Sequence, residues 1–270
     1  MKNKLCDLLD YAELAQASYF YFDLDGYVLK ENNTTITLNE IISSNYNGQM
    51  AGEKEHIGKE YRFIDKKKLN GEFGELQAKQ FFEKYDLLIH QPNTDSGFSA
   101  TLFQHKQSKD FTLAIRGIDE YWIDFKMANI DLIANRIPLL QYNDMLLFYA
   151  QCKGEISFYV DSESKPKDEQ SLEYMLWKKI YNQSKDSKYK PYINQTLLKD
   201  SNKPPTQSNF ISPINSRTKL ILTGHSLGGT LAQLFALSFA TDKDSSIIKE
   251  VYTSNAPSIY LWCEPNIFRI

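Results

Sequence analysis

The segment Gly224-His225-Ser226-Leu227-Gly228-Gly229 constrains the fold of this chain more than any other. A short apolar run, 218–223, precedes it. Leucine and phenylalanine recur at helical spacing through 227–240, which follows it. This order predicts a strand, a sharp turn and a helix. A Gly-x-Ser-x-Gly in that setting is typical of a nucleophile elbow, in which a strained serine stands clear of the turn. The flanking glycines are required because a Cβ would crowd the strand or the helix.

This interpretation places reactive chemistry at Ser226. The helix that follows points its first N–H groups at the reacting centre, where negative charge develops. Glycine and serine are common enough that the three motif positions alone carry little weight. The strand before them and the helix after them carry the argument. The alternative is a glycine-rich strand-to-helix turn of an ordinary α/β domain.

Composition narrows the class of protein. A chain of 270 residues fits one domain, 1–270, with an insertion. The net charge of −3 gives no general attraction to nucleic acid or to an anionic membrane. The three cysteines, Cys6, Cys152 and Cys263, are odd in number and far apart. They suggest no disulfide framework and no metal site, and they suit a reducing cytosolic setting. We expect no cofactor and no metal.

The first residues contain no apolar signal region, and no stretch approaches the length of a membrane span. We therefore expect a cytoplasmic location, with export by a route that needs no cleaved signal as the alternative.

The patterns predict the following elements. Helices are expected at 4–18, 72–88, 121–132, 139–152 and 172–181, so the N-terminal region 1–90 is expected to be helical. Strands are expected at 97–105, 111–116, 153–160, 218–223 and 250–254. Except for 153–160, these strands should share one sheet, with 111–116 beside 218–223. Residues 161–217 are rich in Lys, Asp, Ser, Asn and Pro and are interpreted as a polar surface insertion.

Several pieces together resemble the lipase class 3 family of α/β-hydrolases, over roughly residues 97–257. The residues that carry the resemblance are the segment Leu222–Gly229, the strand Leu113–Ile115 ending in Arg116-Gly117, the pair Trp122 and Asp124, the strand 251–257 and the opening helix 11–19.

This resemblance implies an α/β-hydrolase-like, mostly parallel sheet flanked by helices. It implies hydrolysis of acyl esters, as by a triacylglycerol lipase or a phospholipase A1. Ser226 would be the nucleophile, and the backbone N–H groups of Leu227 and Ile118 would form the oxyanion hole. Ile118 stands where the family usually has Thr or Ser. The implied partner is a lipid or ester substrate, with transient contact to a membrane surface and no nucleic acid.

Other polar residues near these motifs have structural explanations. Arg116 is expected to pair with a carboxylate, and Asp124 to anchor a helix or loop. His225 is expected to point away from Ser226 and to pack structurally. The remaining histidines precede the serine and are interpreted as incidental: His56, His90 and His105.

The acid and the base remain unassigned. A triad in this fold runs in the order Ser, Asp or Glu, then His, but no histidine follows Ser226. No later acid matches the expected position; the acids are Asp242, Asp244, Glu250 and Glu264. We therefore expect an incomplete C-terminal edge of the sheet and weak ester hydrolysis. Three hypotheses stay open: a hydrolase that borrows a base from another histidine or a second chain, a catalytically inactive lipase fold that binds acyl chains, and an interaction protein that uses the polar insertion.

Overall fold

A computed structural model of the chain describes residues 2–19, 28–29, 35, 50–57, 60–68, 75–117, 138–185, 189–239 and 246–259. The predicted helix at 121–132 lies outside these residues. Among the described helices, none is both long enough and apolar enough to span a bilayer.

The centre of the fold is a six-stranded sheet in the order β7-β4-β5-β6-β8-β9. Its strands are β4 (Tyr85–Gln91), β5 (Ala100–His105), β6 (Phe111–Ile115), β7 (Tyr192–Ile193), β8 (Leu220–His225) and β9 (Ile248–Ser254). The prediction that 111–116 lies beside 218–223 is confirmed, because β6 and β8 pair in parallel with Ile115 opposite Gly224. As a result, the C-terminal ends of β6 and β8 lie side by side.

The prediction of a mostly parallel sheet is wrong for the described strands. Pairing is antiparallel for β7-β4, β4-β5 and β5-β6, and parallel only for β6-β8 and β8-β9. Loop length explains the difference: parallel neighbours need a long crossover, whereas short loops join β4 to β5 and β5 to β6. The helix α7 (Leu227–Phe239) provides the crossover between β8 and β9.

Helices cover both faces of this sheet. Because successive strand residues face opposite sides, Leu220 and Leu222 join the core beneath α7 and α5 (Leu139–Cys152). Thr223 faces the other way, where its Oγ1 donates to the Tyr11 carbonyl of α1 (Lys2–Ala17) at 2.9 Å. The helix α1 packs against β6, β8 and β9 and therefore lies over the face opposite α5 and α7.

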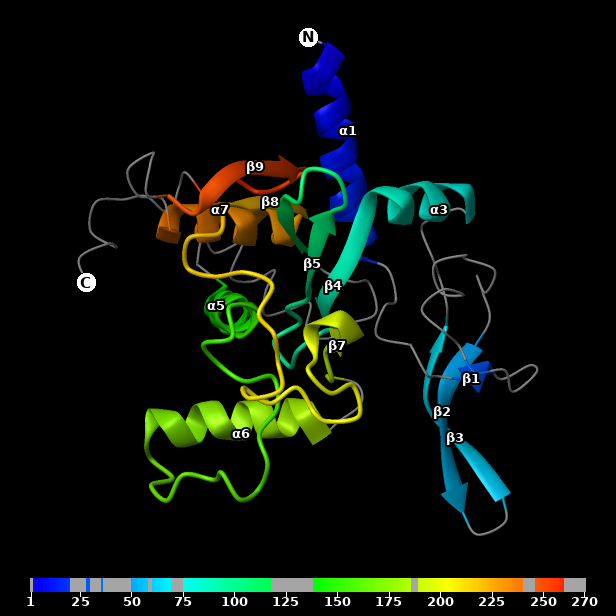
Figure 1. Ribbon diagram of the computed structural model, residues 1–270, viewed down its shortest axis with the longest axis vertical. Coiled ribbons are helices and arrows are strands. Elements are labelled where there is room, and N and C mark those ends of the chain that lie inside the picture. The colour runs from blue at the N-terminus through cyan, green and yellow to red at the C-terminus, as the bar shows by residue number, and fades with distance from the viewer. Residues whose placement is uncertain are drawn as a thin grey trace.

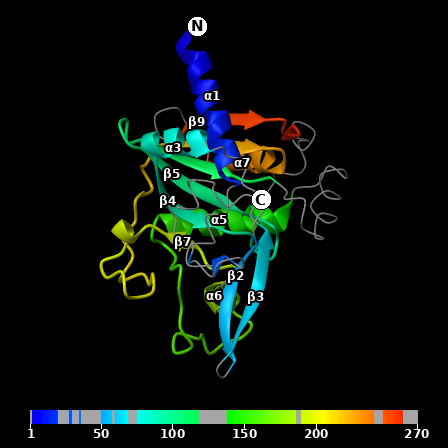
Figure 2. The same ribbon diagram turned by 90° about the vertical axis from the view of Figure 1, so that its right-hand side faces the viewer.

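The N-terminal region 1–90 contains more strand than the prediction of a helical region allowed. Besides α1 and α3 (Glu75–Lys84), it holds β1 (Val28–Leu29), β2 (Met50–Ile57) and β3 (Glu60–Lys68), which form a three-stranded antiparallel sheet. Figures 1 and 2 show the β2–β3 hairpin extending away from the six-stranded sheet, toward the end of the molecule opposite the N-terminus. The predicted helix at 72–88 ends at Lys84 because the next residue, Tyr85, begins the largely buried strand β4.

The polar insertion is also only partly a surface feature. The predicted helix at 172–181 is confirmed as α6 (Leu172–Lys185), whereas residues 153–160 form no strand. The insertion, 161–217, also contributes the strand β7, which pairs with β4 in the central sheet. Three apolar side chains of the insertion are buried in the main core: Leu197, Phe210 and Ile214. The insertion therefore contributes to the sheet and to its core.

Candidate active site

Ser226 occupies the turn between β8 and α7. Its φ is 54°, in the left-handed region that non-glycine residues seldom adopt, which confirms the predicted strain. The surrounding backbone fixes this conformation. The Ser226 N–H donates to the Ser254 carbonyl at 3.1 Å, and the Ser226 carbonyl accepts from the N–H groups of Gly229 (3.0 Å) and Thr230 (3.2 Å). A half-buried serine is thus held by β9 on one side and by the first turn of α7 on the other.

Glycines allow this turn to pack closely, as the sequence predicted. A Cβ on Gly224 would lie 2.5 Å from the Gly228 carbonyl carbon, and a Cβ on Gly228 would lie 2.1 Å from the Ile115 carbonyl oxygen. A Cβ on Gly229 would lie 2.5 Å from the Cβ of Ala256. Real Cβ atoms are not found so close to backbone atoms, so α7 can approach β6 only because these positions lack side chains.

The end of β6 lies directly against this turn. A Cβ on Gly117 would lie 2.7 Å from the His225 carbonyl oxygen and 3.2 Å from the Ser226 Cβ. Leu227 begins α7, and its N–H has no acceptor within the helix because it belongs to the first turn. Leu227 therefore offers a hydrogen-bond donor beside Ser226. Ile118, the other expected donor, lies outside the described residues, so its convergence with Leu227 stays a prediction.

Tyr19 is a site residue that the sequence did not reveal. Its Oη accepts a hydrogen bond from the Gly117 N–H at 3.0 Å and lies 3.1 Å from the Nδ1 of His225. The tyrosine therefore bridges the end of β6 and the turn that holds Ser226. The resemblance covered the opening helix, but no local pattern marked this side chain as part of the site.

His225 packs against Tyr19, as expected for a structural histidine. The two rings meet edge to face with centroids 6.1 Å apart. His90 is buried in β4, with Nδ1 2.8 Å from the Oγ1 of Thr101. Two strands separate β4 from β8, so His90 lies about 14 Å from the strand that carries Ser226.

His105 lies near the end of the sheet at which β8 begins, opposite the end that carries Ser226. Its neighbour Gln104 pairs with Phe111, which pairs with Leu220 at the start of β8. The His105 Nδ1 accepts from the N–H groups of two loop residues. His56 belongs to β2 in the three-stranded sheet, and its side chain lies outside the described part. Among the histidine side chains that the structure describes, none is placed as a base for Ser226.

Among the acidic candidates that the structure describes, none is placed as the acid of a triad with Ser226. Glu250 is exposed and accepts a hydrogen bond from the Tyr252 hydroxyl at 2.6 Å. Arg116 is buried just after β6, where its backbone N–H donates to the Ser99 carbonyl at 3.0 Å. The predicted pairing of its side chain with a carboxylate stays a prediction. The other acids named from the sequence lie outside the described residues: Asp124, Asp242, Asp244 and Glu264.

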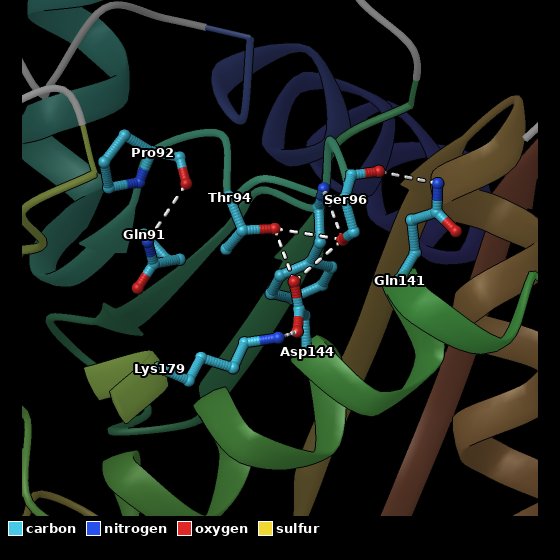
Figure 3. A network of polar contacts seen from close by, with 8 residues as sticks. Gln91, Pro92, Thr94, Ser96, Gln141, Asp144 and Lys179 are labelled. Carbon is cyan, nitrogen blue, oxygen red and sulfur yellow. Dashed lines mark hydrogen bonds and ion pairs between the residues drawn. The ribbon is translucent and has the colours of Figure 1, made fainter. Parts of the chain in front are cut away.

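The most buried carboxylate of the described residues belongs to a separate network (Figure 3). Asp144 of α5 accepts from Thr94 Oγ1 at 2.6 Å and Ser96 Oγ at 2.8 Å, and it forms an ion pair with Lys179 of α6. Gln141 Nε2 donates to the Ser96 carbonyl at 2.7 Å. These donors satisfy the carboxylate and tie two helices to the β4–β5 loop, which is a structural task. In the described part of the chain, no cluster of three His, Cys, Asp or Glu side chains could hold a metal ion.

Comparison with known proteins gives one match. A family model described as lipase (class 3) matches residues 161–263, a range that contains β8, Ser226, α7 and β9. This match starts later than the resemblance found in the sequence, which began near residue 97. No curated protein and no solved structure matches the chain.

Proposed function

We propose that the chain is a serine acyl-ester hydrolase of the triacylglycerol lipase or phospholipase A1 type, because residues 161–263 match the class 3 lipase family model. Ser226 is the nucleophile in this proposal. The observation that carries it is the strained conformation of Ser226, with φ of 54°, between a parallel strand and the first turn of α7. Such a turn presents a hydroxyl at a helix N-terminus, where an oxyanion is stabilised.

The proposed reaction has two steps. The Ser226 hydroxyl adds to the ester carbonyl and loses its proton to a base, and the carbonyl oxygen becomes an oxyanion. The N–H groups of Leu227 and Ile118 donate to that oxyanion. Collapse of the tetrahedral intermediate expels the alcohol, which takes a proton from the protonated base. Water then hydrolyses the acyl-enzyme by the same sequence, releasing the fatty acid and restoring the serine.

The base in this proposal is a histidine that the described side chains do not supply. His90 and His105 are fixed elsewhere in the sheet, and His225 contacts Tyr19. His56 pairs with Tyr61 at the tip of the β2–β3 hairpin, which extends away from the six-stranded sheet (Figure 1), so we take the base from a histidine of a second chain. Because a serine hydroxyl is a weak nucleophile without a base, the 270-residue chain alone should turn over slowly. Loss of a triad member costs a factor on the order of 10⁴–10⁶.

A catalytically inactive lipase fold is the second candidate. It is favoured by one observation: no described histidine side chain forms a hydrogen bond with the Ser226 hydroxyl. Such a protein would keep the turn and bind an acyl chain without cleaving it.

Chemical rescue separates the two candidates. The chain would be assayed with p-nitrophenyl butyrate at rising imidazole concentration, and Ser226→Ala would provide the background at each concentration. Imidazole can supply the missing base, so we expect an increment that depends on Ser226. Ser238→Ala, on the same helix, should retain that increment.

A fluorophosphonate probe gives an independent reading of the same site. We expect slow labelling that imidazole accelerates and that Ser226→Ala removes. Labelling that persists in Ser226→Ala would place the nucleophile elsewhere. Absence of any Ser226-dependent signal with imidazole, in a chain that still binds a fluorescent fatty acid, would select the inactive fold.

A further inference from the structure

Tyr19 joins two segments that approach Ser226 from different parts of the sequence. Its Oη receives the Gly117 N–H from the end of β6 at 3.0 Å and contacts the His225 Nδ1, next to Ser226, at 3.1 Å. A Cβ on Gly117 would lie 2.4 Å from this Oη and 3.2 Å from the Ser226 Cβ. The phenol oxygen and the serine therefore flank the same small space above Gly117.

The helix α1, which ends at Ala17 two residues before Tyr19, is firmly fixed to the sheet. Leu14 and Ala17 of α1 are fully buried. Tyr11 stacks on Tyr252 of β9 with ring centroids 3.9 Å apart. The Tyr19 N–H donates to the Gln16 carbonyl at 3.0 Å, which closes the last turn of the helix. A side chain on such an anchored element can hold its partners within the tolerance that catalysis requires.

The hydrogen-bond chemistry fixes the direction of the contact with Gly117. A backbone N–H can only donate, so the Tyr19 oxygen accepts from Gly117. The contact with His225 has two directions, which differ in the tautomer of the imidazole. We take the one in which the phenol donates to Nδ1 and neutral His225 carries its proton on Nε2; the reverse tautomer is the alternative that the measurement below decides.

We propose that Tyr19 is a positioning residue whose phenol holds the end of β6 against the turn of Ser226. It keeps the Gly117 backbone close to Ser226 and fixes the tautomer of His225. Tyr19 acts through Gly117 and His225 and does not touch the substrate. This role rests on the proposed function, because it concerns the geometry of the same oxyanion site.

The hydrogen-bond bridge from Gly117 through Tyr19 to His225 can be tested without measuring catalysis. In the wild-type chain, ¹⁵N NMR of neutral His225 should show protonated Nε2 and unprotonated Nδ1. Tyr19→Phe keeps the ring and removes only the hydroxyl, so the tautomer preference should weaken and the Gly117 amide should exchange with solvent about 10-fold faster. Tyr142→Phe is the matched control, because it removes a phenol contact with Ser238 between α5 and α7.

The catalytic half is read from kcat and KM in the imidazole-supplemented ester assay. Misplacing oxyanion donors affects the transition state more than substrate binding, so Tyr19→Phe should lower kcat about 10-fold with KM within twofold. Tyr142→Phe should leave both unchanged.

The outcomes separate the two proposals. A wild-type His225 with its proton on Nδ1, or an unchanged Gly117 exchange rate in Tyr19→Phe, would overturn the hydrogen-bond bridge. A changed tautomer with unchanged kcat would overturn the positioning role. If the wild-type chain shows no Ser226-dependent turnover, the proposed function fails and the positioning role falls with it, while the bridge is still decided by the NMR measurements.

Discussion

At the scale of single residues, Gly228 lets the first turn of α7 pack closely against the end of β6. A Cβ there would lie 2.1 Å from the Ile115 carbonyl oxygen and 2.7 Å from the Arg116 carbonyl carbon. Both are backbone atoms, so relief requires the strand or the helix to move. Gly228→Ala should destabilise the fold by on the order of 3 kcal/mol. This cost outweighs the gain of about 1 kcal/mol in helix propensity. The urea midpoint of unfolding measures the difference.

Gly97→Asn is the control for that substitution. Gly97 has φ of 81° and nothing within 4 Å of an added Cβ, and asparagine tolerates this conformation better than most residues. The positive φ still costs some strain, so its urea midpoint should fall, but by much less than that of Gly228→Ala. A Gly228→Ala variant that unfolds at the urea midpoint of the wild-type chain would contradict the close approach of α7 and β6.

The residue scale also shows which parts of the site the sequence could reveal. The strained Ser226 and its flanking glycines were predicted because all the required residues lie within six positions. Tyr19 was missed because its two contacts lie 98 and 206 positions away. No spacing rule links a tyrosine just after one helix to a turn 206 positions later in the sequence.

At the scale of elements, the ion pair between Lys179 and Asp144 fastens α6 to α5. The Asp144 side chain is 1% exposed and the Lys179 side chain is 40% exposed. Lys179→Met leaves a buried carboxylate with its two hydroxyl donors but without a counter-charge. Because solvent reaches Lys179, the cost should be about 1–2 kcal/mol. Hydrogen exchange should rise across α6 while β8 and α7 stay protected.

The exposed neighbour Lys178 provides the control for this prediction. Lys178→Met makes the same change of charge and hydropathy on the same helix, and it should leave exchange in α6 unchanged. Equal exchange in the two variants would mean that the ion pair does not hold the helix.

Local ambiguity explains the errors made at this scale. The segment Tyr85–Gln91, with the apolar run Leu87–Ile89 at its centre, fits either a buried strand or the end of a helix, and only its pairing with β5 decides between them. The strand β7 has two residues and exists because β4 lies beside it. Neither feature has a pattern of its own in the sequence.

At the scale of the whole molecule, the packing of α5 on α7 makes stability sensitive to alkaline pH. Tyr149 of α5 is buried, with ring centroids 5.0 Å from Phe235 and 5.3 Å from Phe239. Burial raises the pKa of Tyr149 to about 12 from an ordinary value of 10.0, with smaller contributions from the charges of Glu155 and Cys152. The folded state thus favours the neutral phenol. Its contribution is fully present below about pH 10 and is lost as pH rises through about 12.

The free energy of unfolding measured from pH 8 to pH 12 should therefore fall steeply above pH 10. Tyr149→Phe removes the titrating group, so its stability should decline less over the same range. A Tyr149→Phe variant that follows the wild-type curve would show that another group controls the alkaline loss.

The order of synthesis gives the bridge at Tyr19 a further consequence. The ribosome releases α1 before β8. His225, which contacts Tyr19, follows it by 206 residues. At about 5–20 residues per second, α1 waits on the order of 10–40 s before β8 can cover it. A helix of 16 residues is marginal on its own in water. Its apolar face, with Leu14 and Ala17, therefore stays exposed on the nascent chain until the sheet forms, and the site around Ser226 can assemble only after β8 and α7 have been synthesised.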